Sequence, residues 1–449
     1  MPKQTLTLDG ILEEATGRVI WVTQATLDNK IKLPRERILD ILKQTTDKDG
    51  GHYIGNPEYQ RKANDLIRIL QQRDVDGEIK DLRDEELEKI ERLAKEFVPR
   101  TKWVTEIGGS PAISAIAAYT LNNGLSQQRI FFIGNLTGTV KDFLSRAQAY
   151  GPLFKYAIDT GKTRKHKPRT TSLEEESGTF KIMMAYSSGR KLQELDRGEF
   201  TRGILNASSN GGTITIGWGG LNKGEPEEYK TLVETITDLF RDGRRPINYI
   251  GTNSFMGYYP GKLIKYLELI NTAADIVSFN DEELRQIYDK LGMPRNNQTQ
   301  GNLTDLLVGL DELMEKNGIE PNREQIRICH SSSGAIAYVP DRLSQYKNAI
   351  KEALQKSVDG ATYTYLERRN PSARDIETYT QTTNCNRRGR QTAKFRRDFG
   401  AIGPNSRVIS AIAPKVTNAK GSTTGLGAVF DGILSVYISA IYSHHSRQP

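Results

Sequence analysis

The sequence predicts an α/β protein in which a parallel sheet carries helices on both faces and a smaller β-containing domain is attached to it. Strand-like and helix-like segments alternate from residue 228 towards the end of the 449-residue chain. The stretch 150–220 differs, because it is rich in Thr, Ser and Gly and holds only short strand-like pieces. The length suits one large α/β domain with a smaller companion.

The C-terminal half supplies most of the regular elements. Apolar residues that recur every three or four positions indicate helices, and short runs rich in β-branched residues indicate strands. The expected strands are 246–250, 274–279, 326–330, 335–339 and 407–413. The expected helices are 228–241, 260–271, 281–291, 303–316, 341–356 and 428–442.

The N-terminal half is less regular. Residues 18–27 read as a strand, 34–98 are strongly charged and helical, 104–122 run from a glycine-rich turn into an apolar helix, and 130–136 read as a buried strand.

From this pattern we expect a division of the chain into two domains. The core would comprise 1–33, 104–149 and 225–449, and the lid, with helical additions, would comprise 34–103 and 150–224.

Composition narrows the class of protein. The chain is 37% hydrophobic and 26% charged, as in ordinary globular proteins. The N-terminus lacks the pattern of a signal peptide, and no apolar run suits a membrane span, so we expect a cytoplasmic protein with no membrane partner. Cys329 and Cys385 form no CxxC pair and the five histidines are scattered, which argues against a disulfide framework or a zinc site. No feature indicates an oligomeric state.

The net charge of +8 is concentrated in two basic clusters, at 162–169 and 387–397. For either cluster alone, a solvated surface is the better interpretation. The more specific interpretation is that a cluster binds a small phosphorylated substrate. Neither cluster is interleaved with aromatic residues, as a single-strand binding groove would be, so nucleic acid is the weakest of the options.

A glycine loop at 421–428 precedes the last expected helix. Its glycines permit a tight turn whose N–H groups converge at a helix N-terminus, where anions bind. Taken alone, a tight turn into a buried helix explains this loop better. The loop is neither a Walker A motif nor a Rossmann fingerprint.

A polar cluster, Asn280-Asp-Glu-Glu283, follows the expected strand 274–279. Polar groups past the carboxyl end of a parallel strand lie where open α/β sheets bind ligands, and a carboxylate there can hold Mg²⁺. A helix cap, with Asn280 as N-cap and acids in the first turn, explains the same residues fully.

Taken together in chain order, these motifs resemble the ribokinase-like kinases, and in detail the ADP-dependent glucokinase and phosphofructokinase branch. The segment 422–427 (STTGLG) is similar to that branch's STVGLG loop. The segment 327–330 resembles its Val-His-Thr strand, and 108–110 resembles its Gly-Gly-Asn substrate loop. The resemblance spans roughly residues 18–440.

The resemblance implies a three-layer αβα large domain, a β-containing lid, and a phosphotransferase that uses Mg²⁺ and ADP, leaving AMP. Its partners would be an adenine nucleotide and a sugar or sugar phosphate. The implied roles are substrate binding by Asp28, Asn29, Gly108, Gly109 and Ser110; nucleotide binding by Asn280, His330 and Thr424; metal binding by Glu283; and an anion hole from Gly425, Leu426, Gly427 and Ala428.

One departure from the family pattern concerns catalysis. The loop of the family ends in an Asp that acts as the base, but this chain has Ala428, which cannot take a proton. Three explanations stay open: an introduced Asp-to-Ala change, replacement of the base by Asp431, or a natural non-catalytic binding protein. We favour the first, because the rest of the loop is intact. Asp431 would lie about 4.5 Å further along the helix axis than residue 428. The alternative interpretation of Asp431 is an acid in the first helical turn that faces the helix dipole.

Two further departures concern the metal and the acceptor. The strand that carries a His-x-Glu segment in the family ends here in Gly251, and Thr26 stands where the family has Asn before the substrate Asp. Free glucose is therefore not the preferred acceptor. The basic clusters would suit an acceptor that already carries a phosphate, because the guanidinium group of arginine matches phosphate oxygens.

Overall fold

The structure is a computed structural model. It describes residues 6–72, 77–136, 150–159, 169–176, 181–186, 197–209, 212–219, 225–240, 245–252, 255, 258–292, 302–383, 390–403, 406–414, 416 and 425–447.

A large domain is built on one sheet, which contains nine strands of the described chain in the order β14-β13-β12-β11-β10-β9-β1-β5-β6. All neighbours from β12 to β6 pair in parallel, whereas β13 pairs antiparallel with both β12 and β14. The strands are β1 (Gly17–Gln24), β5 (Arg129–Leu136), β6 (Ile158–Asp159), β9 (Thr213–Gly219), β10 (Ile247–Gly251), β11 (Ile276–Asn280), β12 (Ile326–Ser331), β13 (Gly334–Tyr338) and β14 (Val408–Ile412).

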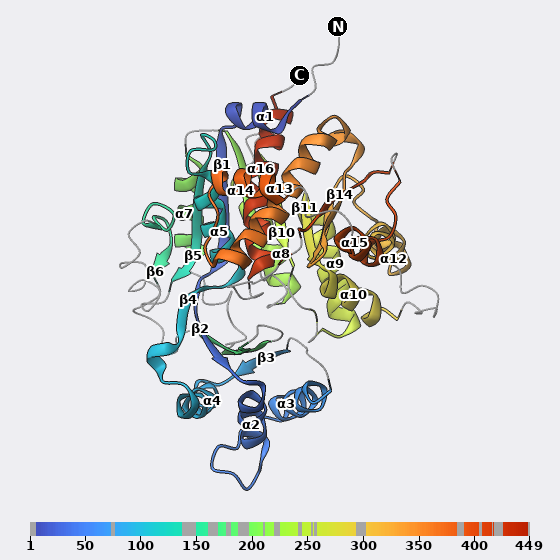
Figure 1. The fold of residues 1–449 in the computed structure, drawn as a ribbon. Coiled ribbons are helices and arrows are strands. Elements are labelled where there is room, and N and C mark those ends of the chain that lie inside the picture. Colours follow the sequence, from blue (N-terminus) through green and yellow to red (C-terminus); the bar gives the residue numbers. More distant parts are fainter. Residues whose placement is uncertain are drawn as a thin grey trace.

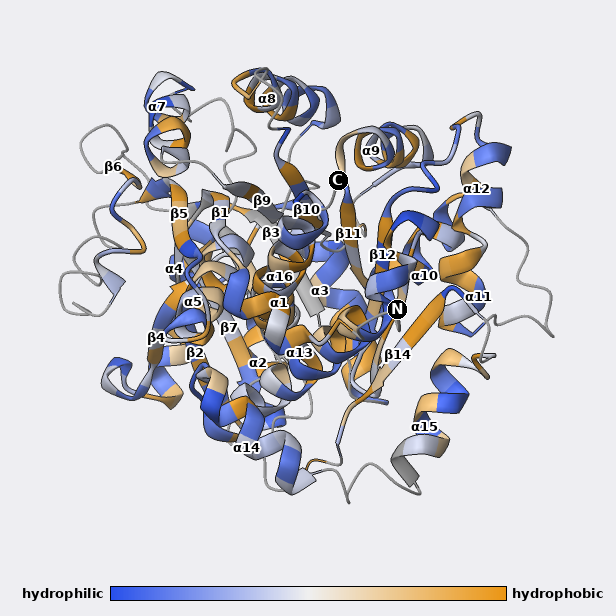
Figure 2. Ribbon diagram, turned by 90° about the horizontal axis from the view of Figure 1, so that it is seen from above, coloured by the Kyte–Doolittle hydropathy of each residue, from blue (hydrophilic) through white to orange (hydrophobic). Residues whose placement is uncertain are grey.

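Helices cover both faces of this sheet, and each face has its own apolar core. Seen from above, α5, α13 and α16 lie on one side of the strands and α7, α8 and α9 on the other (Figure 2). The first face is covered by α1 (Leu8–Glu14), α5 (Ser110–Asn122), α13 (Lys347–Glu367) and α16 (Leu426–His445). The second face is covered by α7 (Arg197–Ser208), α8 (Pro226–Asp238), α9 (Pro260–Ala273), α10 (Asp281–Lys290), α11 (Leu303–Val308), α12 (Leu310–Lys316) and α15 (Arg390–Phe399). Helix α14 (Ala373–Thr383) packs on α13.

The lid is a second, smaller domain that lies below the large domain in Figure 1. Five strands of the described chain form its sheet in the order β3-β8-β7-β2-β4. These are β2 (Thr26–Leu33), β3 (Gly77–Leu82), β4 (Val104–Gly108), β7 (Arg169–Glu175) and β8 (Lys181–Tyr186). Helices α2 (Arg35–Thr46), α3 (Pro57–Leu70) and α4 (Asp84–Phe97) cover the face turned away from the large domain and share a separate apolar core with the strands.

The fold class that the sequence predicts is confirmed: a three-layer αβα domain carries a smaller β-containing domain. The sheets differ from the expected division of the chain in two respects. Strands β2 and β4 belong to the lid sheet, although 1–33 and 104–149 were assigned to the core. Helix α7 and strand β9 belong to the large domain, although they lie within 150–224. Strand β9 pairs between β1 and β10, with its apolar side chains buried in the core on the second face, and long-range pairing of this kind leaves no local signal.

Several element boundaries also differ from the expected ones, and strand β3 interrupts 34–98, which was expected to be helical. The expected strand 18–27 ends as β1 at Gln24, and the chain enters the lid at Thr26. The expected helix 303–316 is divided at Gly309 into α11 and α12. The expected helix 341–356 is a 3₁₀ turn followed by α13, which continues to Glu367.

Helix α16 is the central helix of the large domain. Every residue from Ala428 to Ser443 is buried, and the helix packs against α5, α13 and the sheet. The Trp21 indole on β1 donates a hydrogen bond to Ser435 Oγ (3.3 Å). By length and composition α16 could cross a membrane. Its burial within the protein identifies it as a core helix.

The contact between α16 and α5 predicts the effect of one substitution. A Cβ at Gly432 would lie 2.2 Å from the Ser114 carbonyl oxygen, which is backbone and cannot move aside. We expect Gly432→Ala to lower the free energy of unfolding by at least about 1 kcal/mol, because overpacking displaces the helix. Denaturant titration measures this change. The control is Gly51→Ala, since nothing lies within 4 Å of its added methyl group; equal stability of the two variants would contradict the prediction.

Candidate active site

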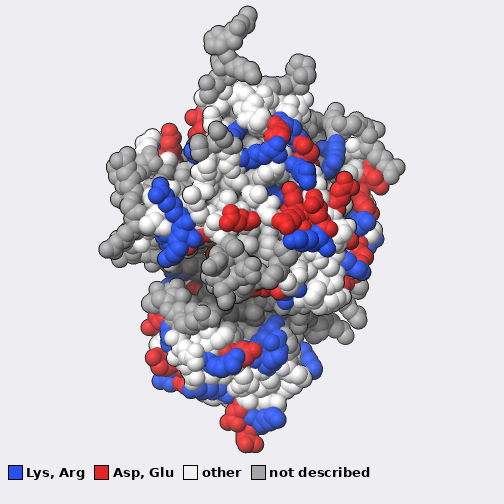
Figure 3. All heavy atoms as spheres, turned by 90° about the vertical axis from the view of Figure 1, so that its right-hand side faces the viewer, with Lys and Arg blue, Asp and Glu red and all other residues white. Residues whose placement is uncertain are grey.

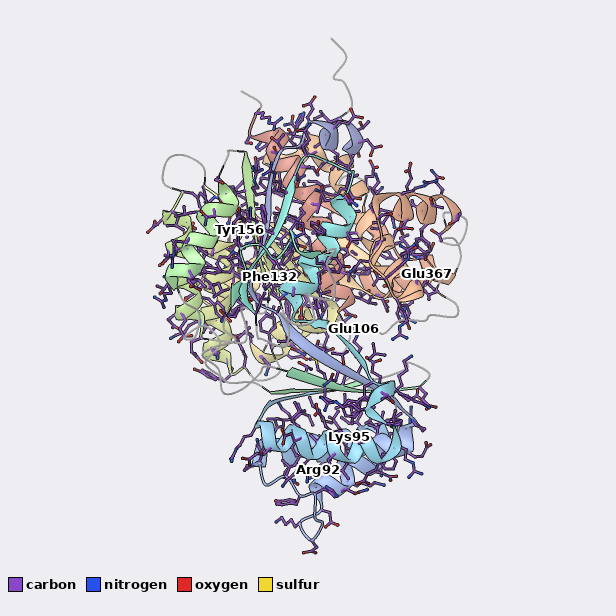
Figure 4. The ribbon with its side chains drawn as sticks, turned by 90° about the vertical axis from the view of Figure 1, so that its left-hand side faces the viewer. Arg92, Lys95, Glu106, Phe132, Tyr156 and Glu367 are labelled. Atoms are coloured by element: carbon purple, nitrogen blue, oxygen red, sulfur yellow. The ribbon has the colours of Figure 1, made fainter. Side chains whose placement is uncertain are left out.

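A cavity of about 290 Å³ lies between the lid and the large domain. Glu106, one of its lining residues, is seen in Figure 4 where the two domains meet. The described lining residues are Asp28, Lys30, Glu106 and Ile107 from the lid, and Ile113, Ile116, Tyr150, Thr364, Arg368, Arg369, Asn370, Gly425, Leu426 and Val429 from the large domain. The cavity therefore brings together the expected substrate residue Asp28 and the glycine loop, which are about four hundred positions apart in the chain.

Asp28 lies on β2 with its carboxylate directly over Gly108 of the neighbouring strand β4. A Cβ at position 108 would lie 2.0 Å from Asp28 Cγ, so glycine is required for this arrangement. Thr26 Oγ1 donates a hydrogen bond to Asp28 Oδ1 (3.0 Å). The carboxylate is buried to 8% exposure, yet it borders the cavity, where a ligand hydroxyl could donate to it.

Asn29, Gly109 and Ser110 are placed differently from Asp28. Successive residues of a strand point to opposite faces. Asn29 accordingly accepts a hydrogen bond from Thr105 Oγ1 (2.9 Å) and is not among the described residues that line the cavity. Gly109 is the N-cap of α5 and Ser110 begins that helix; neither is among the described lining residues, although Ile107 and Ile113 on either side are.

The cationic side chains of the cavity were not identified from sequence. Lys30 pairs with Glu106 (2.6 Å) and Arg369 with Asp375 (2.8 Å), whereas Arg368 has no ion pair with a described residue. Arg368 ends α13 in a left-handed conformation (φ 58°). The sequence signal for Arg368 was the polar run just before Pro371. The expected helix ended at 356, however, so the sequence analysis did not place Arg368 at the site.

The two basic clusters that the sequence singled out are only partly described. Residues 162–168 and 384–389 lie outside the described residues. Lys394 contacts Ser332 from α15 and is not among the described lining of the cavity. On the face shown in Figure 3, described Lys and Arg side chains are intermingled with Asp and Glu over both domains.

The glycine loop opens the N-terminus of α16 onto the cavity. Gly425 is the N-cap and has a left-handed backbone (φ 80°), which residues with a side chain rarely adopt. The first N–H groups of a helix have no acceptor within the helix and therefore favour an anion at this end. Ala428 is buried, and its carbonyl accepts a hydrogen bond from Ser114 Oγ (2.8 Å). Thr424 and the rest of 421–424 lie outside the described residues.

The expected nucleotide-binding residues lie side by side. Asn280 on β11 is in register with His330 on β12. A Cβ at Gly427 would lie 3.0 Å from His330 Cε1, so the His330 ring borders the glycine loop. The ring also packs on Phe430, with centroids 4.8 Å apart. Burial lowers the pKa of His330 to about 4, which leaves the imidazole neutral at physiological pH.

Glu283 and Asn280 form a capping box at the start of α10. Asn280 N donates to Glu283 Oε2 (2.9 Å), and Glu283 N donates to Asn280 Oδ1 (2.7 Å). Thr252 Oγ1 donates to the same Glu283 oxygen (2.7 Å). Burial raises the pKa of Glu283 to about 7, and the nearby Asp431 contributes in the same direction. The prediction that Asn280 caps a helix is therefore confirmed. The pKa of Glu283 is nevertheless unusually high for a carboxylate.

Asp431 lies in the second turn of α16, because the helix begins at Leu426, so its assignment as a first-turn acid was wrong. Its Oδ1 accepts a hydrogen bond from the Tyr249 hydroxyl (2.7 Å). Its Oδ2 lies 2.8 Å from the position that a Cβ at Gly251 would occupy. Burial raises the pKa of Asp431 to about 6. Asp431 thus faces the end of β10, and it is not among the described residues that line the cavity.

Glu283 and Asp431 are the carboxylates of this region that could hold a metal ion. Within the described part of the chain, no group of three His, Cys, Asp or Glu side chains is arranged to hold a metal ion. Mg²⁺ does not require one, because it usually takes one or two carboxylates together with water and phosphate oxygens. Two neighbouring buried acids with raised pKa values fit a divalent cation, which would compensate their charge.

Comparison with known proteins identifies solved structures that share this fold. No protein-family model matches the chain, and no curated protein sequence matches it. Among solved structures, it is similar to a phosphofructokinase from Pyrococcus horikoshii OT3 with AMP, at 12% identity over 96% of this chain and 100% of that one (TM-score 0.62). It is also similar to an ADP-dependent kinase in complex with fructose-6-phosphate and ADPβS, at 11% identity over 98% and 96% of the two chains (TM-score 0.64).

A third similar structure is the last common ancestor of ADP-dependent phosphofructokinases from Methanosarcinales, at 13% identity over 96% of each chain (TM-score 0.60). At these identities the likeness establishes a shared fold over nearly the whole length. The expected architecture, including the lid, is therefore that of these kinases.

The raised pKa of Glu283 predicts how stability depends on pH. The folded state disfavours the ionised carboxylate, so this residue should lower the free energy of unfolding as the pH rises from about 4.3, the unfolded value, to about 7, by up to about 4 kcal/mol. Glu283→Gln keeps an oxygen acceptor but does not titrate. We expect the stability of the wild type relative to this variant to fall between pH 4 and pH 8.

Unfolding free energies at several pH values measure this difference. Glu282→Gln, which changes the exposed neighbour, is the control and should reproduce the wild-type profile. Identical profiles for Glu283→Gln and the wild type would show that Glu283 titrates normally.

Proposed function

We propose that this chain, which shares the fold of the ADP-dependent phosphofructokinases, carries a phosphotransferase site that moves a phosphoryl group from ADP to a hydroxyl of a sugar phosphate, leaving AMP. The observation that carries the proposal is the composition of the interdomain cavity. One small space is bordered by a buried carboxylate, a cation without a described partner, and the N-terminus of a helix.

The acceptor would lie between Asp28 and Arg368. The Asp28 carboxylate is limited to accepting hydrogen bonds when ionised, so it suits the hydroxyl groups of a sugar. Arg368 offers a guanidinium group that matches phosphate oxygens. Lys30 and Arg369 add positive charge to the same wall, although each already pairs with a carboxylate. This division favours a sugar that already carries a phosphate over a free sugar.

The donor would lie along Asn280, His330 and the first turn of α16. The neutral His330 ring can stack or accept a hydrogen bond without repelling a cation. The free N–H groups at Leu426 and Gly427 would stabilise negative charge on the transferred group. Among the solved kinases of this fold, one phosphofructokinase holds AMP, and one ADP-dependent kinase is in complex with fructose-6-phosphate and ADPβS. Their ligands support ADP as donor.

Mg²⁺ would be held by Glu283, with Asp431 close enough to contribute through water. When bound, it would neutralise phosphate charge during transfer. Thr252 and the Asn280 backbone orient the Glu283 carboxylate, and Tyr249 orients that of Asp431. No described cation pairs with either acid.

Ala428 leaves the site without a general base at the position where the resemblance expects one. Asp431 does not replace it, because its carboxylate is held by Tyr249 and faces β10 rather than the cavity. An introduced change at 428 therefore explains the otherwise complete loop best.

The second candidate function is a non-catalytic protein that binds a nucleotide and a sugar phosphate on the same fold. The observation that favours it is the loss of two acids at once, at Ala428 and at Gly251. Restoring one residue separates the two functions.

We expect Ala428→Asp to raise phosphoryl transfer at least about 100-fold, because a positioned base contributes roughly 10²–10⁴. The assay pairs ADP and ATP as donors with free sugars, sugar phosphates and nucleosides. Ala428→Asn, which is similar in size to Asp but carries no base, is the control and should stay inactive. If the Asp variant binds nucleotide yet transfers nothing to any acceptor, the binding protein is the better description.

Arg368→Gln tests the acceptor phosphate. Losing one charge-assisted contact should weaken binding of a sugar phosphate about 10-fold or more and leave the free sugar unaffected. Calorimetric titration measures both ligands. The control is Arg374→Gln, an exposed arginine on α14 that is not among the described lining residues. Equal losses for both ligands would remove Arg368 from phosphate recognition.

A further inference from the structure

A second cavity, of about 410 Å³, lies in the large domain at the start of β5. It is formed by the end of α5 and the turn after it, by the first residues of β5, and by the segment 152–156. Because β5 runs from Arg129 towards the lid, this cavity lies at the opposite end of the strand from the active site. Tyr156, which lines it, lies well away from the lid in Figure 4. Its volume is within the range of small-molecule sites.

The charge of this cavity is positive. Arg129 and Lys155 line it, and neither forms an ion pair with a described residue. The described lining contains no Asp or Glu. A further cation lies beside them, because Arg18 on β1 is the register partner of Arg129.

Arg18 is buried to 7% exposure, and its guanidinium donates to the carbonyls of Gly17 (2.8 Å) and Ser209 (3.3 Å). Burial and the neighbouring Arg129 charge lower the pKa of Arg18. Like charges on adjacent strands destabilise a sheet unless something compensates them, and a bound anion would do so.

The walls of the cavity are aromatic. The rings of Phe131 and Tyr156 lie 5.3 Å apart, and Lys155 Nζ lies 5.3 Å from the Tyr156 ring. Tyr119 forms a further wall. Such rings offer stacking surfaces for a planar group. Gln128, also in the lining, is buried to 5% exposure, and its Oε1 has no hydrogen-bond partner, whereas its Nε2 donates to the Val436 carbonyl.

We propose that this cavity is a second ligand site, separate from the active site, for a nucleoside monophosphate. Arg129 and Lys155 would bind the phosphate, and the rings of Phe131, Tyr156 and Tyr119 would contact the base. An N–H group of the base would suit the unpartnered Gln128 oxygen after a small side-chain movement. The inference does not depend on the proposed function, since it uses no residue of the interdomain cavity.

The two cavities share one aromatic contact. Tyr119 of the second cavity packs edge-on against Tyr150, with centroids 6.3 Å apart, and Tyr150 lines the active-site cavity. A nucleotide in the second cavity would therefore touch a residue whose neighbour borders the sugar site.

The test is photolabelling of the full chain with an azido derivative of AMP, followed by peptide mapping. We expect label within 119–131 or 150–156, displaced by AMP but not by equal concentrations of adenosine or inorganic phosphate. The variant R129Q/K155Q should reduce this labelling about 10-fold or more, since each charge-assisted contact contributes about 1.5–3 kcal/mol. R92Q/K95Q removes one exposed arginine and one exposed lysine from α4 of the lid (Figure 4) and should leave the labelling unchanged.

Labelling near 425–430 reports the active site, so the two proposals can fail separately. Absence of label from both 119–131 and 150–156 would overturn the second site. Displacement by adenosine alone, or by phosphate alone, as strong as that by AMP would overturn its assignment to a nucleotide. Lys155→Glu, a single change at an exposed side chain, keeps the test decisive if the double variant does not fold; labelling as strong as in the wild type would count against the site.

Discussion

The arrangement of the active site depends on the burial of α16. A helix that is apolar on all sides must be covered on all sides, and here the sheet, α5 and α13 cover it. Close packing through Gly432 sets its distance from α5, and the hydrogen bond from Trp21 ties it to β1. The N-terminus of α16 therefore lies at the carboxyl ends of the parallel strands. The glycine loop is thereby brought to the lid, to His330 and to the two buried acids.

Two acids in this region oppose stability. Glu283 and Asp431 are buried beside each other, and each holds its proton more tightly than in water. Hydrogen bonds from Thr252, Tyr249 and the Asn280 backbone offset only part of the penalty. Residues of this kind are typical of functional sites, because a bound cation can supply the missing compensation.

Much of the fold follows from local pattern. The alternation of elements after residue 228, the capping box at Asn280 and the turn at Gly425 were all readable from sequence, because helix periodicity, caps and glycine turns act over a few residues. The boundary between the lid and the large domain could not be predicted from the sequence. Pairing of β2 with β7 and of β9 with β1 joins segments more than a hundred positions apart, and nothing local distinguishes the two sheets.

The site residues also divide into those that short motifs predict and those whose position depends on the whole fold. Asp28 and the glycine loop were expected together on a family resemblance, and the structure brings them to one cavity. The side to which Asn29 points depends on strand register, and the position of Arg368 depends on where α13 ends. Neither of these is encoded in a short motif.

The close approach of Asp431 to Gly251 has an evolutionary consequence. An Oδ2 atom 2.8 Å from a would-be Cβ means that a side chain on the strand would require the Asp431 carboxylate to leave its present position. Among relatives of this protein, the two positions should therefore change as a pair. Lineages that keep a larger residue at the end of β10 should carry a smaller or differently oriented one on α16, so that one negative charge reaches this part of the site from either element.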